Sequence, residues 1–404
     1  MKILMLHSAF NQQNILKQPW RVTYELSRFF TKLGHEVTIF TDVNDKVDFG
    51  DDSAKVECIN YEHLRFKIKL VKPLLEDYDI LLYFGNSLSG IYLSRLKDIR
   101  PPLVLYISSA HYFFSELRYL SLKELASHWL HLCFSLPPLR YVVRLLNKGL
   151  ISKIVVPNNF LKERLVKCGV NERKILVFPI GFNAREYFES KSNIVNVKER
   201  LGFSSEEFII TYLGSPLTIR GADTLIKATY ILNKRLKRFK VILLLRVDSK
   251  EEVKEEIFLH SLIRELNLSS RFFVTSGVLR HERIKEYIHA SDVIALPFKI
   301  VQSEPPLSIL ESMALGKPVV TTKTCGLPEL ISNDKGVLVE PNNPRDLALA
   351  IYELARDSQL RASIGQKARR FALKMPNWEF VTGLYERLFK DLISQNEDKR
   401  KLRC

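Results

Sequence analysis

Short apolar runs alternate with amphipathic segments of helix length along almost the whole chain. The first series of apolar runs comprises Lys2–His7, Glu36–Thr41, Ile80–Phe84, Leu103–Ile107, Lys153–Val156 and Ile175–Phe178. After a polar stretch, a second series comprises Phe208–Leu213, Val241–Leu245, Arg271–Val274, Val293–Leu296, Val319–Thr321 and Gly336–Val339. Uninterrupted apolar strands separated by helices are typical of parallel sheets covered on both faces. The pattern therefore predicts an α/β protein with two doubly wound, Rossmann-like domains.

The gap between the two series predicts the domain organisation. We expect an N-terminal domain over residues 1–180, a C-terminal domain over 187–375, and a last helix over 378–394 that packs back onto the N-terminal domain. Two domains also suit a chain of 404 residues, because a single domain commonly holds about 100–200. Doubly wound sheets bind ligands at the carboxyl ends of their strands, so the expected active site is the cleft between the domains.

Composition and charge narrow the class of partner. Hydrophobic residues make up 46% and charged residues 26%, which excludes a disordered or fibrous chain. The net charge of +16 favours an anionic partner, namely a phosphorylated ligand, an acidic membrane surface or nucleic acid. No recognised nucleic-acid-binding motif accompanies this charge, so we predict no nucleic-acid partner.

The same survey predicts a cytoplasmic protein. The opening MKILMLHSAF has too short an apolar run for a signal peptide, and no stretch of about 18 apolar residues predicts a membrane span. The five cysteines have neither zinc nor redox spacing, and their odd number suits free thiols in a reducing compartment.

The loop after the strand Val293–Leu296 leads into a Ser-Glu-Pro-Pro run, which is typical of a helix start. Ser303 is expected to cap this helix. The free N–H groups of Leu307 and Ser308 would then face the strand ends, where a helix start with its positive dipole binds a diphosphate. Glu311, one turn further on the same side, can accept hydrogen bonds from both hydroxyls of a ribose.

A second strand, turn and helix follow in the stretch Ile209–Ala228. Gly214 ends the strand and permits close approach of a ligand to the backbone. Arg220, at the start of the next helix, can neutralise a leaving diphosphate. An ordinary loop with a solvated arginine is the alternative, which the pairing with the Glu311 helix disfavours.

Together these segments resemble the retaining GT-B glycosyltransferases of family 4 (group 1). Further similarity lies in Met1–Ser8, Gly34–Thr38, Lys153–Gly169 and Lys174–Phe188, so the resemblance covers most of the chain. It implies a nucleotide-sugar donor bound by the C-terminal domain and a glycan or lipid-linked acceptor bound by the N-terminal domain. It implies no cofactor, because the nucleotide sugar is a substrate.

The chain departs from the family's diphosphate loop at one position. In that loop, five residues separate a Gly from a Lys-Gly pair, and the first of the five is Arg. Here Gly214 is retained, Arg220 stands in place of the lysine, and Ser215 stands in place of the arginine. The loss of one of two cations should weaken diphosphate binding or require a substitute.

The family's pair of glutamates is also altered. Glu311 matches the second, which binds the ribose. The first, which contacts the donor sugar, would fall at Ser303, and Glu304 follows one position later. We expect Glu304 to take over the sugar contact and Ser303 to remain part of the donor site.

The resemblance assigns two further donor contacts and leaves a third position open. The nucleobase is expected to bind the backbone at Gly277–Arg280, which includes Val278. His111 resembles a histidine that contacts the donor sugar, and it follows a predicted strand at the carboxyl end; a buried histidine satisfied by backbone is the alternative. Arg246 stands where the family commonly has glycine, either as a surface arginine or as a donor contact. We take His111, Arg220 and Glu304 as the catalytic groups.

Two patterns that could bind metal are rejected. Asp77 and Asp79 precede the strand Ile80–Phe84 and so lie at its amino end, away from the cleft. His128 and His131 form a pair without a third ligand. The prediction is a metal-independent enzyme.

Basic segments in the N-terminal half suggest a membrane contact. Residues 117–174 hold eleven Lys and Arg against three Glu, interleaved with aromatic residues and leucine, and residues 65–72 are a smaller basic patch. Such segments can lie on an anionic membrane surface. Ordinary helices with solvated charges explain the pattern equally well.

We therefore expect a retaining hexosyltransferase that uses a nucleotide-sugar donor. Phe10–Trp20 contains no glycine where the family often has a Gly-Gly loop, which suggests an altered acceptor pocket. The alternatives are a nucleotide-sugar epimerase and a non-catalytic nucleotide-sugar-binding protein. Product analysis with and without acceptor separates the three.

Overall fold

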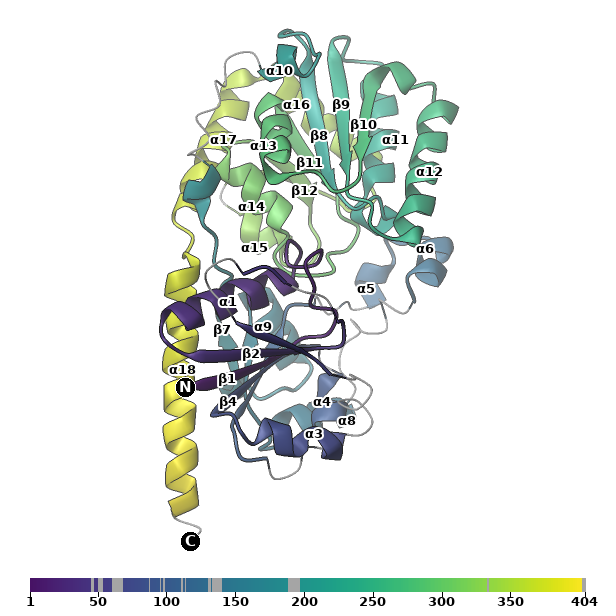
Figure 1. The fold of residues 1–404 in the computed structure, drawn as a ribbon. Helices are drawn as coiled ribbons and strands as arrows, with labels where there is room; N and C mark the ends of the chain where they lie inside the picture. Colours follow the sequence, from purple (N-terminus) through teal and green to yellow (C-terminus); the bar gives the residue numbers. More distant parts are fainter. Residues whose placement is uncertain are drawn as a thin grey trace.

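The computed structural model describes residues 1–44, 47–49, 54–59, 68–86, 88–94, 96, 99–109, 112, 114–129, 132, 140–187, 197–332 and 334–401. The strands form two parallel sheets, one from each half of the chain. Figure 1 shows the C-terminal sheet stacked above the N-terminal sheet, each with helices around it. The predicted fold class, two Rossmann-like domains, is confirmed.

The N-terminal sheet has seven strands in the order β3-β2-β1-β4-β5-β6-β7. The strands are β1 (Lys2–Leu6), β2 (Glu36–Thr41), β3 (Lys55–Cys58), β4 (Ile80–Gly85), β5 (Leu103–Ile107), β6 (Ile151–Val156) and β7 (Ile175–Val177). The inner strand β5 is buried at every residue, because its unbroken apolar run is covered on both faces.

The C-terminal sheet has six strands in the order β10-β9-β8-β11-β12-β13. The strands are β8 (Phe208–Gly214), β9 (Phe239–Leu245), β10 (Phe272–Ser276), β11 (Val293–Leu296), β12 (Val319–Thr322) and β13 (Val337–Val339). In the register of β8 and β9, Gly214 lies opposite Leu245, so the residues that follow each strand emerge side by side.

Helices cover both sheets. They are α1 (Trp20–Lys32), α3 (Ile68–Leu75), α4 (Ser89–Leu93), α5 (Phe114–Leu117), α6 (Leu122–Ser127), α8 (Arg140–Asn147), α9 (Asn159–Lys167), α10 (Val197–Arg200), α11 (Ala222–Leu232), α12 (Lys250–Glu265), α13 (His281–Ala290), α14 (Leu307–Ala314), α15 (Leu327–Ile331), α16 (Pro344–Arg356), α17 (Ser358–Leu373) and α18 (Trp378–Lys401). Short 3₁₀ turns lie at η1 (Glu172–Lys174), η2 (Ala184–Tyr187), η3 (Thr218–Arg220) and η4 (Ser269–Arg271).

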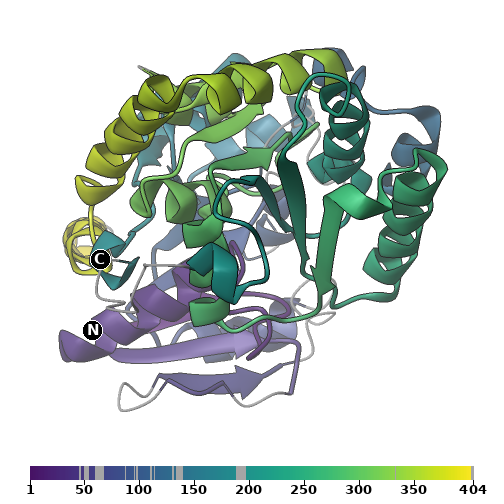
Figure 2. The same cartoon turned by 90° about the horizontal axis from the view of Figure 1, so that it is seen from above.

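Two chain segments cross between the domains and lie against each other. Phe182 N–H donates to the Pro376 carbonyl at 2.8 Å, and a Cβ on Gly181 would lie 2.4 Å from the Trp378 ring. The chain then continues as α18, which runs along the N-terminal domain in Figure 1 and is seen end-on at the edge of Figure 2. The Phe389 ring stacks on Phe30 of α1 at 5.5 Å.

Candidate functional site

The loop between β11 and α14 differs from the prediction. The helix begins at Leu307, and Pro306 occupies the N-cap position without a side-chain cap. The prediction that Ser303 caps this helix is wrong, because Ser303 forms an antiparallel bridge with Ser109 of the N-terminal domain. The Ser303 hydroxyl donates to the Ser108 hydroxyl at 3.2 Å. This loop therefore joins the two domains as well as leading into α14.

The start of α14 provides hydrogen-bond donors at the carboxyl end of the sheet. The first N–H groups of a helix, here those of Leu307 and Ser308, have no intrahelical acceptor. The Ser308 hydroxyl oxygen is buried without a hydrogen-bond partner. Buried polar groups normally have partners, so this helix start is equipped for an anionic ligand.

Glu311 follows one turn later and is partly buried beside the segment between the domains. The Tyr187 hydroxyl donates to its carboxylate at 3.1 Å. The Tyr187 ring meets His281, the first residue of α13, edge to face at 5.2 Å. Burial lowers the pKa of His281, against the opposing effect of the Glu311 charge. Tyr187 and His281 were not predicted as neighbours of Glu311.

Gly214 and Arg220 are in contact at the end of β8. Gly214 has φ = +140°, and a Cβ there would lie 2.8 Å from Nη2 of Arg220. The guanidinium also lies over the Phe298 ring at 4.9 Å, and its Nε is buried without a hydrogen-bond partner. Ser215 is 3% exposed, and its hydroxyl accepts the Leu217 N–H at 3.3 Å, so this neutral side chain stays inside the loop.

Val278 follows β10 and is 67% exposed. The preceding Gly277 has φ = +106°, in the region that favours glycine, and its N–H donates to the Leu245 carbonyl at 2.9 Å. The predicted base-binding segment is thus anchored to the end of β9.

A cavity of about 300 Å³ lies between the domains at the ends of β1, β4 and β5. Its lining from the N-terminal domain is His7, Ser8, Pro19, Trp20, Phe84, Gly85, Asn86, Tyr106, Ser108, Ser109, Tyr112, His128 and Leu132. From the C-terminal domain come Ile219, Ile300, Gln302 and Ser303. Among these described lining residues there is no Asp, Glu, Lys or Arg.

The side chains that line this cavity include aromatic rings and uncharged polar groups. His7 stacks between Phe84, at 4.7 Å between ring centroids, and Trp20, at 5.6 Å. Burial lowers the pKa of His7 to about 3, so the imidazole is uncharged at neutral pH. Three buried polar atoms have no hydrogen-bond partner, namely Tyr106 Oη, Ser109 Oγ and Gln302 Nε2. The cavity therefore suits an uncharged ring that carries hydroxyl groups.

Glu304 is not among the residues that line this cavity. It is 1% exposed, accepts the Gly326 N–H at 2.8 Å, and accepts from Asn158 Nδ2 of the N-terminal domain at 3.3 Å. Burial raises its pKa to about 7, and the nearby Glu329 charge adds to the effect. The structure places Glu304 at a contact between the domains, so its predicted role at the donor sugar stays a prediction.

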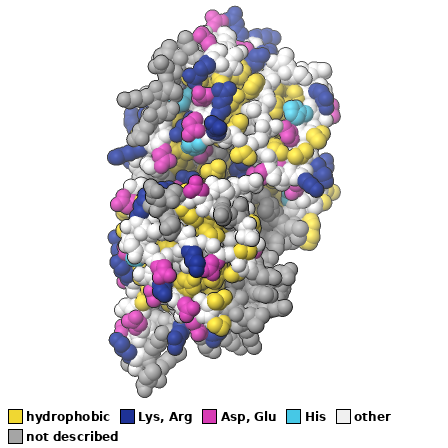
Figure 3. Space-filling model, in the orientation of Figure 1, with side chains coloured by type: hydrophobic (Ala, Val, Ile, Leu, Met, Phe, Trp, Pro, Cys, Tyr) yellow, Lys and Arg dark blue, Asp and Glu magenta, His cyan; other side chains and the backbone are white. Residues whose placement is uncertain are grey.

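Some of the predicted residues lie outside the described chain. They are His111, residues 65–67 of the smaller basic segment, and residues 130–131 and 133–139 of the larger one, which include His131. Within the larger basic segment, Leu122 is 85%, Trp129 57% and Tyr141 62% exposed. Figure 3 shows basic and acidic side chains interspersed over the face it presents.

Of the two rejected metal patterns, the structure describes both residues of the first, Asp77 and Asp79, but only His128 of the second. Asp79 accepts the Lys2 N–H at 2.7 Å, at the amino end of β1 and β4. Among the described residues, no group of three or more His, Cys, Asp and Glu could hold a metal ion. In the same part of the chain, no helix is long and apolar enough to cross a membrane.

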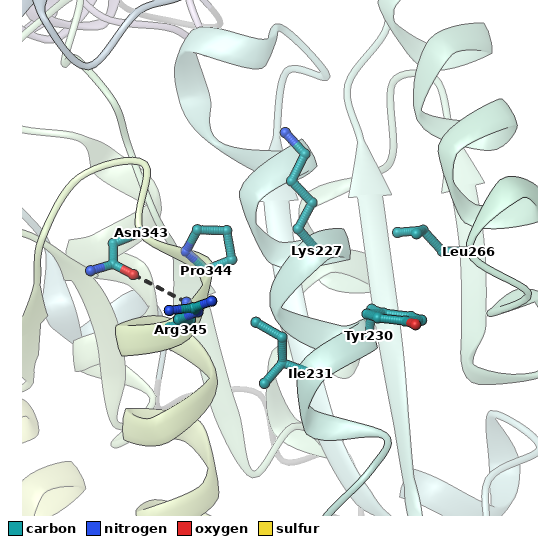
Figure 4. Close-up of a pocket in the computed structure, with 7 residues that line it drawn as sticks. All are labelled: Lys227, Tyr230, Ile231, Leu266, Asn343, Pro344 and Arg345. Carbon is teal, nitrogen blue, oxygen red and sulfur yellow. Dashed lines mark hydrogen bonds between the residues drawn. The ribbon is translucent and has the colours of Figure 1, made fainter.

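A second cavity, of about 380 Å³, lies in the C-terminal domain between α11 and the start of α16. Figure 4 shows Lys227, Tyr230 and Ile231 on α11, with Asn343, Pro344 and Arg345 at the start of α16 on one side and Leu266, the residue after α12, on the other. None of these residues lines the neutral cavity between the domains or belongs to the predicted donor site.

The fold and the site between its domains define a GT-B protein. A family model for group 1 glycosyl transferases matches residues 194–371, and one for glycosyltransferase family 4 matches residues 20–186. The two matches cover the two domains in turn. The chain is therefore a glycosyltransferase with a family 4 domain in its N-terminal half and a group 1 domain in its C-terminal half.

Several curated relatives agree with this membership. An uncharacterized glycosyltransferase of Methanocaldococcus jannaschii is 25% identical over 79% of this chain and 76% of its own length. A D-inositol 3-phosphate glycosyltransferase of Corynebacterium jeikeium is 27% identical over 54% of this chain and 52% of its own. The N-acetyl-alpha-D-glucosaminyl L-malate synthase of Bacillus anthracis is 24% identical over 53% of each chain. The chain thus matches about half the length of the last two.

Solved structures share the whole fold at low sequence identity. Sucrose-phosphate synthase from Thermosynechococcus elongatus superposes with a TM-score of 0.77, covering 98% of this chain and 99% of its own, at 18% identity. Anabaena HepE in complex with UDP superposes with a TM-score of 0.76, covering 97% of this chain and 100% of its own, at 19% identity.

Proposed function

We propose that this glycosyltransferase moves a sugar from a nucleotide-sugar donor to a glycan or lipid-linked acceptor, with retention of anomeric configuration and without a metal ion. One juxtaposition carries the proposal. Ile219, beside Arg220, and Ser303, on the loop into α14, both line the neutral cavity between the domains. An anion-binding edge and a cavity suited to a sugar ring are therefore contiguous.

The donor would lie along the carboxyl edge of the C-terminal sheet. Arg220 and the start of α14 would bind the diphosphate, Glu311 the ribose, and the backbone at Val278 the base. The sugar would enter the cavity, with His111 as a further contact. Glu304 could reach the sugar only after giving up its contacts with Gly326 and Asn158. Uridine diphosphate sugars are the first donors to test, because HepE was solved with UDP-glucose.

The described cavity lining contains no carboxylate that could serve as a base or nucleophile. This supports a mechanism in which the leaving phosphate assists the acceptor on the same face of the sugar. The bond between the anomeric carbon and the phosphate oxygen breaks, the acceptor oxygen bonds to that carbon, and its proton passes to the departing phosphate. Arg220 and the α14 N–H groups would stabilise the negative charge of the leaving group.

The test is to incubate the purified protein with a panel of nucleotide sugars and a crude lipid and glycan extract, in the presence of EDTA. We expect mass spectrometry to show release of a nucleoside diphosphate and a product heavier by one sugar unit. Arg220→Gln should lower kcat/KM by roughly a hundredfold. Arg283→Gln is the matched control, because that arginine is 47% exposed and paired with Glu286 on the surface.

The alternatives give different outcomes. An epimerase would convert the donor sugar without acceptor, and a non-catalytic protein would bind donors without turnover. Loss of activity in EDTA that is restored by a divalent cation would overturn metal independence. Nuclear magnetic resonance of the new glycosidic bond decides whether configuration is retained.

We also propose that the protein contacts an anionic membrane surface, where a lipid-linked acceptor would lie, through the exposed side chains of Leu122 and Trp129. The double change Leu122→Ser and Trp129→Ser should reduce co-sedimentation with vesicles of anionic phospholipid. Phe380→Ser is the control, because Phe380 is 56% exposed but lies on α18. Equal sedimentation of all three proteins would reject the membrane contact.

A further inference from the structure

Arg246 is the residue directly after β9, and it shares a neighbour with Arg220. Its N–H donates to the Gly214 carbonyl at 2.9 Å, while the Arg220 guanidinium packs against the Cα of the same glycine. Burial lowers the pKa of Arg246, and the charge of Arg220 is the second cause. Two arginines from different strand ends are thus brought together at one glycine.

The positive charges and N–H donors of the two arginines are only partly matched by acceptors within the chain. The Nε atoms of both are buried without a hydrogen-bond partner. Asp248 lies 3.5 Å from Arg246 Nε, an ion contact without hydrogen-bond geometry, and it is also bound by Lys17 of the N-terminal domain. Glu252 is the other carboxylate whose charge acts on Arg246. Adjacent like charges repel each other and their buried Nε donors are unused, which favours an added anion.

The loop after β8 provides only part of an anion site. Ser215 is neutral and directed inward, so Arg220 is the cation that this loop presents. Arg246 emerges from the neighbouring strand on the same carboxyl edge, because β8 and β9 are paired and parallel up to Gly214 and Leu245. A second positive charge is therefore available from a different element.

We propose that Arg246 is a second phosphate-binding residue, which forms with Arg220 a two-arginine clamp on the diphosphate of the donor. The inference rests on the proposed function and assigns a specificity-determining residue to its donor site. Two guanidinium groups can each bind a phosphate through paired N–H donors. Arg246 would thus provide the charge that Ser215 does not.

The clamp is tested by isothermal titration of wild type, Arg246→Gln and Arg246→Lys with UDP, uridine and inorganic pyrophosphate. ADP and GDP with their nucleosides follow if UDP does not bind. Arg246→Gln should weaken binding of the nucleoside diphosphate and pyrophosphate by about tenfold or more and leave nucleoside binding unchanged. Arg246→Lys should be intermediate, because it keeps the charge but not the paired donors. Arg238→Gln, an arginine 73% exposed, is the control.

The comparison of diphosphate with nucleoside separates a binding role from a structural one, because a disrupted site would lose affinity for both. Unchanged diphosphate affinity in folded Arg246→Gln, or an equal loss for nucleoside and diphosphate, overturns the clamp while the proposed function stands. Failure of wild type to bind any nucleoside diphosphate overturns the proposed function itself. Circular dichroism shows whether each variant is folded.

Discussion

At the scale of one residue, burial raises the pKa of the Glu304 carboxyl group. Its carboxyl group is fully enclosed where the C-terminal domain meets Asn158, and its hydrogen bonds with Gly326 and Asn158 offset the desolvation only in part. A pKa of about 7 means that the group takes up a proton within the physiological range. This contact between the domains is therefore sensitive to pH.

Glu304→Gln should change the pH dependence of stability. Folding raises the pKa of Glu304 from 4.5 to about 7, so the folded state holds the proton more tightly. The resulting stability is present below the unfolded pKa and is lost as pH rises through about 7. Between about pH 5.5 and 8, wild type should lose about 2 kcal/mol more unfolding free energy than Glu304→Gln. Urea unfolding of both proteins at the two pH values measures this, and parallel pH profiles would contradict it.

At the scale of elements, α18 joins the end of the chain to the N-terminal domain. Tyr385 packs against Phe178 edge to face at 5.0 Å, and Glu386 contacts His35 at 3.0 Å. Asn396 Nδ2 donates to the Arg100 carbonyl at 2.7 Å. The helix therefore completes the core of a domain from which it is remote in sequence.

Phe389→Ala should destabilise the protein by about 3–5 kcal/mol, because it removes a fully buried ring and leaves a cavity against α1. Phe389 is 0% exposed, whereas Phe380 on the same helix is 56% exposed. Phe380→Ala should change stability by less than about 0.5 kcal/mol. Denaturant unfolding compares the two variants, and equal losses would show that α18 does not depend on this contact.

At the scale of the whole molecule, a buried ion cluster spans the domains. Lys299, which follows β11, lies 2.6 Å from Glu124 of α6 and 3.0 Å from Asp223 of α11. Burial alone would raise the pKa of Glu124, but its hydrogen bond and ion pair with Lys299 lower the value below its usual range. The Tyr112 hydroxyl donates to the Val301 carbonyl nearby. These polar contacts thus join the two domains beside the neutral cavity.

Lys299→Met should separate the domains and reduce sugar transfer. It leaves Glu124 and Asp223 without their shared cation, which should cost about 3–5 kcal/mol of stability. Small-angle scattering should show a larger radius of gyration. Lys323→Met is the control, because Lys323 and Glu340 form an exposed pair worth at most about 1 kcal/mol. A folded Lys299→Met variant with unchanged radius and activity would show that other contacts hold the domains together.

The local pattern of apolar and polar residues was sufficient to predict most of the strands. Apolar runs such as Leu103–Ile107 and Val293–Leu296 match the observed strands, because a buried parallel strand must be apolar throughout. β3 was not predicted, because its sequence Lys-Val-Glu-Cys has no apolar run and lies partly exposed at the sheet edge. The cap of α14 was predicted wrongly, because Ser303 is held by the other domain.

By itself, the sequence determined that the chain forms two parallel sheets and that Gly214, Arg220, Leu307 and Glu311 belong to turns and helix starts at their carboxyl edge. These features depend on residues close together in the chain. Tertiary structure alone decided the partners of Glu304, the neutral cavity around His7 and the meeting of Arg246 with Arg220. Those contacts join residues far apart in sequence, and only the packing of strands and domains brings them within interaction distance.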